Sequence, residues 1–287
     1  MARNSALAFA WCAAILSACG AHATTAEPKS ASLASGRRIV TLVPSFADDV
    51  FAIGAGGELV GVSAFSDRPQ AKQLPRVADS SSVDSEAILT LRPTVVIGIP
   101  AQARLTEPLR RAHVRVVLLS DDAYDRIFEN LRVIGALTGH ELEARATIAR
   151  LRRETSALQA RTKGFVRRPS VFVVLGSGPI WTAGANSYIT TLIALAGGAN
   201  AASDLHAAYG QYSGEALLRH QPDMLVADAA TNLDAVLDRE PWHSLRAVRL
   251  RHVYSVDPDL LERPGPSYNQ GLRWLVDRLT PLAVATP

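Results

Sequence analysis

One stretch of the chain occurs twice. "SEAILTLRPTVVI", residues 85–97, has the same pattern as "GEALLRHQPDMLV", residues 214–226. Glu86 and Glu215 lie 129 positions apart, and so do Pro93 and Pro222, so the match holds without a gap. Each copy reads as a short helix that a proline ends before an apolar strand. Because the order of the flanking pieces also agrees, the repeat predicts two halves that are built alike.

The first residues read as an export signal. "MARNSALAFAWCAAILSACG" has one early arginine, then an apolar run, then small residues. The apolar run is too short to span a membrane, so this layout is typical of an export signal. Its end, Leu16 to Gly20, resembles the lipobox of bacterial lipoproteins and predicts lipidation at Cys19. Ordinary cleavage after Ala23 is the alternative. We therefore expect a lipoprotein-type signal at 1–19 and a flexible tether at 20–36.

The remaining chain reads as α/β. Continuous apolar runs bounded by turns predict strands buried on both faces, as in parallel sheets. Residues 140–164 contain no proline and no glycine before Gly164, and predict one long helix of about 36 Å. This gives an N-terminal lobe at 37–139, a connecting helix at 140–164 and a C-terminal lobe at 165–287. The expected strands are 38–43, 59–65, 94–99, 114–119, 170–175 and 251–256, and the expected helices include 85–92, 105–112, 187–198 and 269–279.

Several function classes are excluded by what the sequence lacks. It has no nucleophile elbow, no zinc-protease motif, no phosphate loop and no Cys-x-x-Cys pair. The glycine-rich "GSGPIWTAG" lacks the arrangement that holds a dinucleotide. A net charge of +3 without a basic cluster argues against a nucleic-acid partner. The histidines form no set with metal-ligand spacing, although His206 lies in an irregular stretch where a ligand could meet it.

The aromatic residues point to a ligand. Only 6% of the chain is aromatic, yet five of these side chains fall in loops that follow predicted strands or precede helices. In open α/β sheets such loops face the ligand crevice, and flat side chains there suit a large, flat, partly apolar ligand. The alternative is that these rings cover the edges of the lobes. The five are Phe46, Phe65, Trp181, Tyr209 and Tyr212.

Several motifs together resemble one family across residues 37–282. They are "RIVTLVPS", "GVSAFSDRP", the paired segments described above, "WTAGANSYITTLIALAGGAN" and "RPGPSYNQGLRWL". They resemble the periplasmic substrate-binding proteins of ABC importers for cobalamin and iron chelates. The resemblance implies an α/β fold with two Rossmann-like lobes, each with a parallel sheet, joined by one long rigid α-helix.

The resemblance also gives the repeated glutamates a role. In this family each lobe presents a surface glutamate that docks onto the permease dimer at the inner membrane, and the matching residues are Glu86 and Glu215. Two similar charged corners suit two copies of one surface. Each glutamate is equally understandable as a first-turn helix residue that the helix dipole favours.

The "GVSAFSDRP" segment is most similar to the cobalamin-binding branch, so the resemblance implies a corrinoid ligand held by Ser45, Phe46, Phe65, Trp181, Tyr209 and Tyr212. The first-lobe tryptophans of well-known members are absent, which leaves haem or a ferric siderophore open. Tyr209, Tyr212, Tyr268 and His206 are the side chains that could then meet iron.

The expected protein is a periplasmic, lipid-anchored binding protein with no catalytic residue, no cofactor and no metal of its own. Its partners would be a small-molecule ligand, the permease, and the membrane through the anchor only. The rival from another class is a nucleotide-using enzyme.

Overall fold

The computed structural model describes residues 36–228 and 231–284, all of which belong to one structural unit, Ala34–Pro287. The predicted signal, with Cys19, lies outside the described residues, as does all but the last residue of the predicted tether. No helix within the described ranges is both long enough and apolar enough to cross a membrane.

The N-terminal lobe is a five-stranded sheet in the order β3-β2-β1-β4-β5, and all neighbouring strands are parallel. This confirms the predicted parallel sheet of the first half. Its strands are β1 Ile39–Thr41, β2 Leu59–Ser63, β3 Arg76–Ala78, β4 Val95–Gly98 and β5 Val116–Leu118. Its helices are α1 Pro44–Ala52, α2 Ser85–Thr90, α3 Glu107–Arg111 and α4 Tyr124–Thr138, with 3-10 turns η1 Gly56–Glu58, η2 Pro69–Ala71 and η3 Pro100–Gln102.

The C-terminal lobe has a mixed sheet in the order β11-β10-β6-β7-β9, and β8 pairs with β6 beside this path. Its strands are β6 Ser170–Ser177, β7 Ile180–Ala183, β8 Ala199–Asn200, β9 Tyr209–Gln211, β10 Met224–Asp228 and β11 Val253–Val256. Its helices are α6 Tyr188–Leu195, α7 Gly214–His220, α8 Arg246–Arg249, α9 Pro258–Leu261 and α10 Tyr268–Val284, with the 3-10 turn η4 Leu233–Ala235.

The prediction of a parallel sheet was wrong for part of this second lobe. β6, β10 and β11 are parallel, but β7 runs antiparallel to β6 and β9 runs antiparallel to β7. The stretch "GSGPIWTAG" had been interpreted as a glycine-rich loop. Instead, Gly178 and Pro179 form a tight connection, after which the chain returns along β6 as a strand.

The two copies of the repeat fold alike. α2 is capped by the Asp84 side chain, which accepts from the Ala87 amide, and α7 is capped by Ser213, which accepts from the Ala216 amide. After each helix one residue takes a left-handed conformation, Arg92 at φ 46° and Gln221 at φ 43°. These two residues are again 129 positions apart, so the repeat extends to the backbone conformation of single residues.

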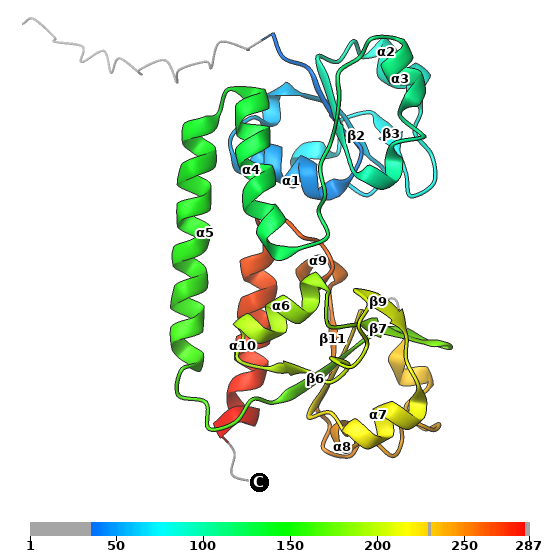
Figure 1. Cartoon of the computed structure of the whole chain (residues 1–287), viewed down its shortest axis with the longest axis vertical. Helices are drawn as coiled ribbons and strands as arrows, with labels where there is room; N and C mark the ends of the chain where they lie inside the picture. Colours follow the sequence, from blue (N-terminus) through cyan, green and yellow to red (C-terminus); the bar gives the residue numbers. More distant parts are fainter. Residues whose placement is uncertain (1–35, 229–230, 285–287) are drawn as a thin grey trace, which may run out of the picture. The chain divides into compact units, whose positions relative to one another are not determined.

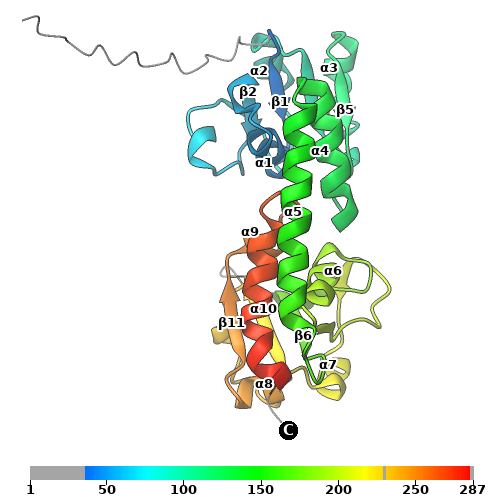
Figure 2. The ribbon, with the colours of Figure 1, turned by 90° about the vertical axis from the view of Figure 1, so that its left-hand side faces the viewer.

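The predicted connecting helix is present as α5 Glu141–Thr162, 22 residues that span about 33 Å. Its buried stripe contains Ile148, Leu151, Thr155 and Leu158, as the sequence predicted. It packs against α4 of the N-terminal lobe and α10 of the C-terminal lobe, and Figure 2 shows it running past both. Gly139 lies between α4 and α5 at φ 72°, a conformation that favours glycine, and lets the chain reverse direction.

The cores explain how the lobes hold together. One buried cluster extends along α5, α4 and α10 and includes residues of both sheets, such as Ile97 and Val173. The outer face of each sheet has its own smaller cluster, around Val40 in the first lobe and around Phe172 in the second. Figure 1 shows α2 and α3 over the first outer face and α7 and α8 at the second, opposite the side of α5. The core on the side of α5 is therefore shared by both lobes, whereas each lobe has a separate core on the outer face of its sheet.

Candidate ligand cleft

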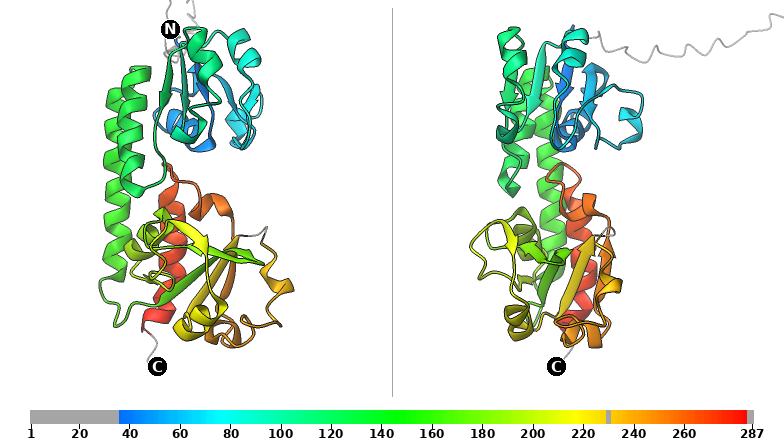
Figure 3. Two further views of the ribbon diagram at one scale, coloured as in Figure 1. Left: turned by 45° about the vertical axis from the view of Figure 1, so that its right-hand side comes forward. Right: turned by 90° about the vertical axis from the view of Figure 1, so that its right-hand side faces the viewer.

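A cavity of about 360 Å³ lies between the two lobes. The N-terminal lobe lines it with the segments that follow β1, β2 and β5. These segments lie at the carboxyl edge of the parallel sheet, where ligands bind in such folds. Its C-terminal wall is α9 and the turn after it. Figure 3 shows these lobes facing one another beside α5. The lining residues are Val43, Pro44, Ser45, Phe65, Asp121, Pro258, Asp259, Glu262, Arg263 and Pro264. Ser45 and Phe65, two of the expected ligand contacts, are therefore at this cavity.

Three aromatic side chains of the described chain are exposed, and all three had been expected to meet a ligand. They are Phe65 at 53%, Trp181 at 40% and Tyr209 at 40%. In the β7–β9 pair Trp181 lies opposite Gln211, and Ala183 lies opposite Tyr209. Since alternate residues of a strand share a face, Trp181 and Tyr209 project from the same face of this ribbon. The C-terminal lobe thus presents two exposed rings on one face of this ribbon.

Tyr209 is close to the acidic groups of the cleft. Partial burial, followed by the negative charges of Glu262, Asp121 and Asp122, raises the pKa of its phenol to about 12. Asp121 and Asp122 belong to the N-terminal lobe and Glu262 to the C-terminal lobe. The hydroxyl of Tyr209 therefore stays protonated at neutral pH. Neither Tyr209 nor Trp181 is among the residues that line the cavity.

Phe46 is not available to a ligand, which corrects the expectation from sequence. Its side chain is fully buried in the shared core, because α1 begins at Pro44 and turns Phe46 inward beneath the sheet. The sequence predicts a turn at Pro44 and Ser45 and a helix from Phe46 onward, whereas α1 already begins at Pro44. The residue that reaches the cavity is the neighbouring Ser45, whose hydroxyl donates to Asp121 Oδ2 at 2.9 Å.

Tyr212 is also displaced from the expected site. It follows β9 on the opposite face from Tyr209, packs on Phe172 with ring centroids 5.5 Å apart, and donates its hydroxyl to Asp204 at 2.7 Å. Tyr268, considered for iron, is 1% exposed, and its hydroxyl contacts Thr155 Oγ1 at 2.7 Å. His206 is exposed, but the described residues contain no cluster of three or more potential metal ligands.

The cleft is acidic. Burial raises the pKa of Asp121. Burial, then the charges of Asp228 and Asp259, raises the pKa of Glu262 to about 7. The pKa of Asp259 rises to about 6 through burial and a hydrogen bond with Asp67. Three carboxyl groups thus line the cavity, and for each of them burial makes the ionised form less favourable than it is in water.

Arg263 is the cation of the cavity, and carboxylates of both lobes already hold it. Its guanidinium is 2.6 Å from Asp259 Oδ1, 2.8 Å from Asp67 Oδ1 and 3.7 Å from Asp48 Oδ2. It also donates to the carbonyl of Phe65 at 3.4 Å. The side chain is 14% exposed. Arg263 therefore connects the C-terminal lobe to the loop that carries Phe65.

Sequence reasoning missed the charged residues of the site: Asp121, Asp259, Glu262 and Arg263. One signal was available, because Asp121 follows the apolar strand 114–119 at the edge where ligands bind. Asp259 carries the same signal, because it follows the expected strand 251–256, whereas nothing comparable marks Glu262. They approach Asp121 only because α9 folds back over the cleft after β11.

The two expected docking residues occupy equivalent positions. Glu86 and Glu215 are both the second residue of their helices, α2 and α7, and both are exposed. Neither has an ion pair among the described residues. In Figure 1, α2 lies in the N-terminal lobe and α7 in the C-terminal lobe, at opposite ends of the described structure.

Two α/β lobes joined by a helix, with an aromatic and polar cavity between them, define a bilobal ligand-binding protein. The family model described as "Periplasmic binding protein" matches residues 39–260. The chain belongs to this family, as the sequence motifs indicated.

Relatives of known structure or name agree in fold and differ in ligand. The chain is 27% identical to the Bacillus subtilis ABC transporter substrate-binding lipoprotein YvrC, over 85% of this chain and 80% of that protein. The Vibrio cholerae vitamin B12-binding protein BtuF is 26% identical with a TM-score of 0.76, covering 87% and 98% of the two chains. The Roseiflexus heme-binding protein RhuT is 26% identical with a TM-score of 0.78, covering 86% and 99%.

The family and these relatives define the general function. The protein is the substrate-binding component of an ABC importer, with a permease partner and a small ligand, and its relatives are substrate-binding proteins rather than enzymes. An extracytoplasmic location follows from the same relationships.

Proposed function

We propose that the protein captures a corrinoid, a cobalamin-like ligand, in the cleft between its lobes and delivers it to the permease. The observation that carries this choice is the charge of the cleft. Asp121, Asp259 and Glu262 line the cavity, and Arg263, the cation among its lining residues, is ion-paired with carboxylates of both lobes.

An acidic cleft discriminates between the ligand classes. Haem carries two carboxylates, and bringing them beside three further carboxyl groups would cost electrostatic free energy without a free cation to offset it. A cobalamin is neutral or cationic over its corrin, and its rim carries amide groups. Amide N–H groups can donate to carboxylates such as Asp121 and Glu262.

The exposed rings support the same class. Phe65 on one lobe and Trp181 and Tyr209 on the other offer apolar area for a large flat ligand. Iron ligation by Tyr209 would need its phenolate, which the raised pKa of about 12 and the neighbouring carboxylates oppose. A haem or ferric siderophore ligand is the alternative, for which Tyr209 and the exposed His206 are the available groups.

Equilibrium titration tests the proposal. Hydroxocobalamin, haem and a ferric siderophore are each titrated into the purified full chain by calorimetry and visible absorbance. We expect the corrinoid to bind most tightly. The Trp181→Ala variant should bind it about tenfold more weakly or worse, and Tyr212→Phe should bind it as the unmodified chain does. Tight haem binding with no corrinoid heat would contradict the proposal.

Two further parts of the proposal concern delivery. Glu86 and Glu215 would dock on matching sites of the permease dimer, since they are exposed at equivalent helix positions of two similarly built corners. Cys19 would carry a lipid that keeps the protein at a membrane without a membrane span, which the name of the lipoprotein relative supports. Palmitate labelling of the chain, compared with Cys19→Ala, tests the anchor.

A further inference from the structure

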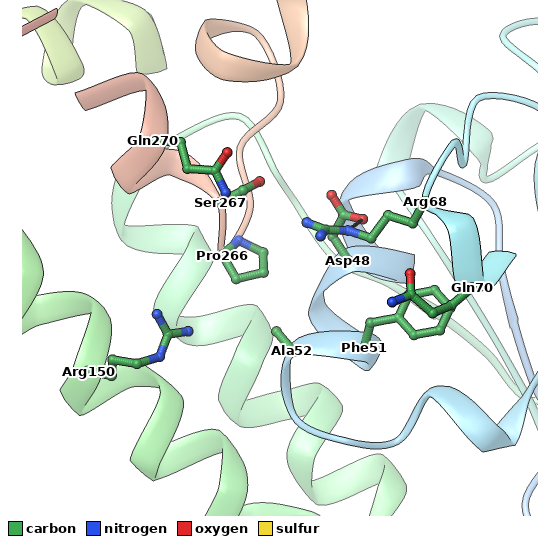
Figure 4. Close-up of a pocket in the computed structure, with 9 residues that line it drawn as sticks. All are labelled: Asp48, Phe51, Ala52, Arg68, Gln70, Arg150, Pro266, Ser267 and Gln270. Atoms are coloured by element: carbon green, nitrogen blue, oxygen red, sulfur yellow. Dashed lines mark hydrogen bonds and ion pairs between the residues drawn. The ribbon is translucent and has the colours of Figure 1, made fainter. Parts of the chain in front are cut away.

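A second cavity lies behind the ligand cleft, on the side of α5. It has a volume of about 320 Å³, within the usual range of small-molecule sites. Figure 4 shows it surrounded by side chains of the N-terminal lobe, of α5, and of the start of α10. The polar groups at its walls are Asp48, Arg68, Gln70, Arg150, Ser267 and Gln270.

The side chains that line this cavity have more hydrogen-bond donors than protein acceptors to receive them. Arg68 engages Asp48 through Nε, and Arg150 donates Nη1 to Glu154 at 2.9 Å. Most N–H groups of both guanidinium groups therefore have no acceptor among the residues that the structure describes. The side-chain amides of Gln70 and Gln270 and the hydroxyl of Ser267 make no hydrogen bond within the described part of the chain.

The charge of this cavity is opposite to that of the cleft. Two arginines and one carboxylate line it, and the carboxylate, Asp48, is 3% exposed and already contacts both Arg68 and Arg263. The cleft in front has three carboxyl groups and one arginine. Arginines therefore outnumber carboxylates in the lining of this cavity, and carboxyl groups outnumber arginines in the lining of the cleft. A groove that shares Arg68, Ser267 and Gln270 with this cavity also contains Arg263 and the carboxylates Asp67, Asp257 and Asp259.

Arg150 can turn from its present partner at little cost. The Arg150–Glu154 pair is a surface i,i+4 pair with side chains 50% and 36% exposed, a type that contributes little to stability because water screens it. Glu154 also accepts from Asn269 Nδ2 at 2.9 Å, so it keeps a hydrogen bond if Arg150 moves. An anion in the cavity is a stronger partner for Arg150 because it also receives the donors of Arg68 and Gln270.

We propose that this back cavity binds a small oxyanion with several acceptor oxygens, a phosphate or a carboxylic acid, separately from the transported ligand. Arg150 of α5 and Arg68 of the N-terminal lobe supply the charge. Gln270 and Ser267 of the C-terminal lobe supply neutral donors. Because the donors come from both lobes and the helix between them, the bound anion ties the three together and stabilises the folded chain.

Calorimetry and thermal unfolding of the full chain test this site with two probes, inorganic phosphate and citrate, against chloride at matched ionic strength. We expect saturable binding of at least one probe with a rise in Tm, and no such effect from chloride. The two probes separate phosphate from carboxylate recognition. Arg150→Gln and Gln270→Ala should each weaken binding about tenfold.

Matched controls locate the anion. Arg145→Gln removes a cation from the same helix at a position that does not line the cavity, and should leave binding unchanged. Glu262→Gln alters the cleft and should also leave it unchanged. The proposal is overturned if neither probe binds, if Arg150→Gln binds as well as Arg145→Gln, or if the cleft variant alone changes the affinity. None of these outcomes depends on the transported ligand being a corrinoid.

Discussion

The two halves of the protein are alike where they face away from the cleft and different where they face it. The segments from α2 to β4 and from α7 to β10 agree in capping, in the left-handed residue and in the strand that follows. At the cleft, the first half offers Phe65 and Asp121 from loops, and the second offers Asp259 and Glu262 from α9 and the turn after it. The second half also has the antiparallel strands β7 and β9, which carry the exposed Trp181 and Tyr209 and have no counterpart in the first sheet. The shared parts suit a symmetric partner, and the parts that differ suit an asymmetric ligand.

The largest expected difference between the halves is in how much stability a truncated side chain costs in each outer core. By the register of β1 on β4 and β6 on β10, Val40 and Phe172 are equivalent, and both are fully buried. Phe172→Ala should lower the free energy of unfolding by about 3–5 kcal/mol. Val40→Ala should cost less because it removes only two methyl groups. Denaturant unfolding followed by circular dichroism measures both; equal losses would contradict this size argument.

Two tyrosines of one strand region separate ligand contacts from structural contacts. If a ligand in the cleft also contacts the exposed ring of Tyr209, as proposed, Tyr209→Ala should weaken binding about tenfold or more. Tyr212→Ala should lower stability by removing the packing on Phe172, yet leave the affinity within about twofold. Calorimetry on both variants checks this, and an equal loss of affinity would mean that Tyr212 also reaches the ligand.

The equivalent corners should act together. Glu86→Lys and Glu215→Lys should each reduce uptake, and the double variant should reduce it roughly tenfold, because both docking contacts become repulsive. Ligand affinity of the isolated protein should stay unchanged. Glu107→Lys, at another exposed helix start in the N-terminal lobe, is the control. Uptake that continues undiminished in the double variant would exclude docking through these residues.

The smallest expected effect is on the pH dependence of stability. It comes from a buried carboxyl group in α1, the first helix of the N-terminal lobe, that α6, the first helix of the C-terminal lobe, lacks. Asp49 is 2% exposed, and burial, then Asp48 and Asp121, raise its pKa well above the usual range, whereas α6 contains no carboxyl group. A carboxyl with a raised pKa binds more protons in the folded chain, so its contribution to stability falls as pH rises.

Asp49→Asn removes this titration. The variant should therefore be more stable than the unmodified chain at pH 8, and the gain should shrink towards pH 5. Thermal unfolding at several pH values measures it. A gain that does not depend on pH would show that Asp49 is not the titrating group.

Much of the fold could be predicted from local patterns. The strands around 39–41, 95–98 and 116–118 and the long helix 141–162 were visible because each has a continuous apolar run or an apolar stripe. α4 was not predicted, although Ile127, Phe128, Leu131 and Ile134 follow helical spacing. The strands β7 and β9 were missed because glycine-rich and polar residues surround them, and their pairing joins segments distant in sequence.

The site was predicted only in part, for a physical reason. Of the five aromatic residues expected to meet a ligand, Phe65, Trp181 and Tyr209 are exposed, whereas Phe46 and Tyr212, chosen by the same rule, face cores. One position along a helix or strand turns a side chain to another face, and a loop prediction does not resolve that position.

The sequence by itself determined the duplicated architecture, the helix that joins the halves and the family, because these follow from local periodicity and motifs. The tertiary structure alone decided which aromatic rings are exposed and which lie in cores, that three carboxyl groups from two lobes line the cleft, and that Arg68 and Arg150 line a second cavity. Residues such as Asp121 and Glu262 are 141 positions apart, and only the packing of both lobes on α5 brings their charges together.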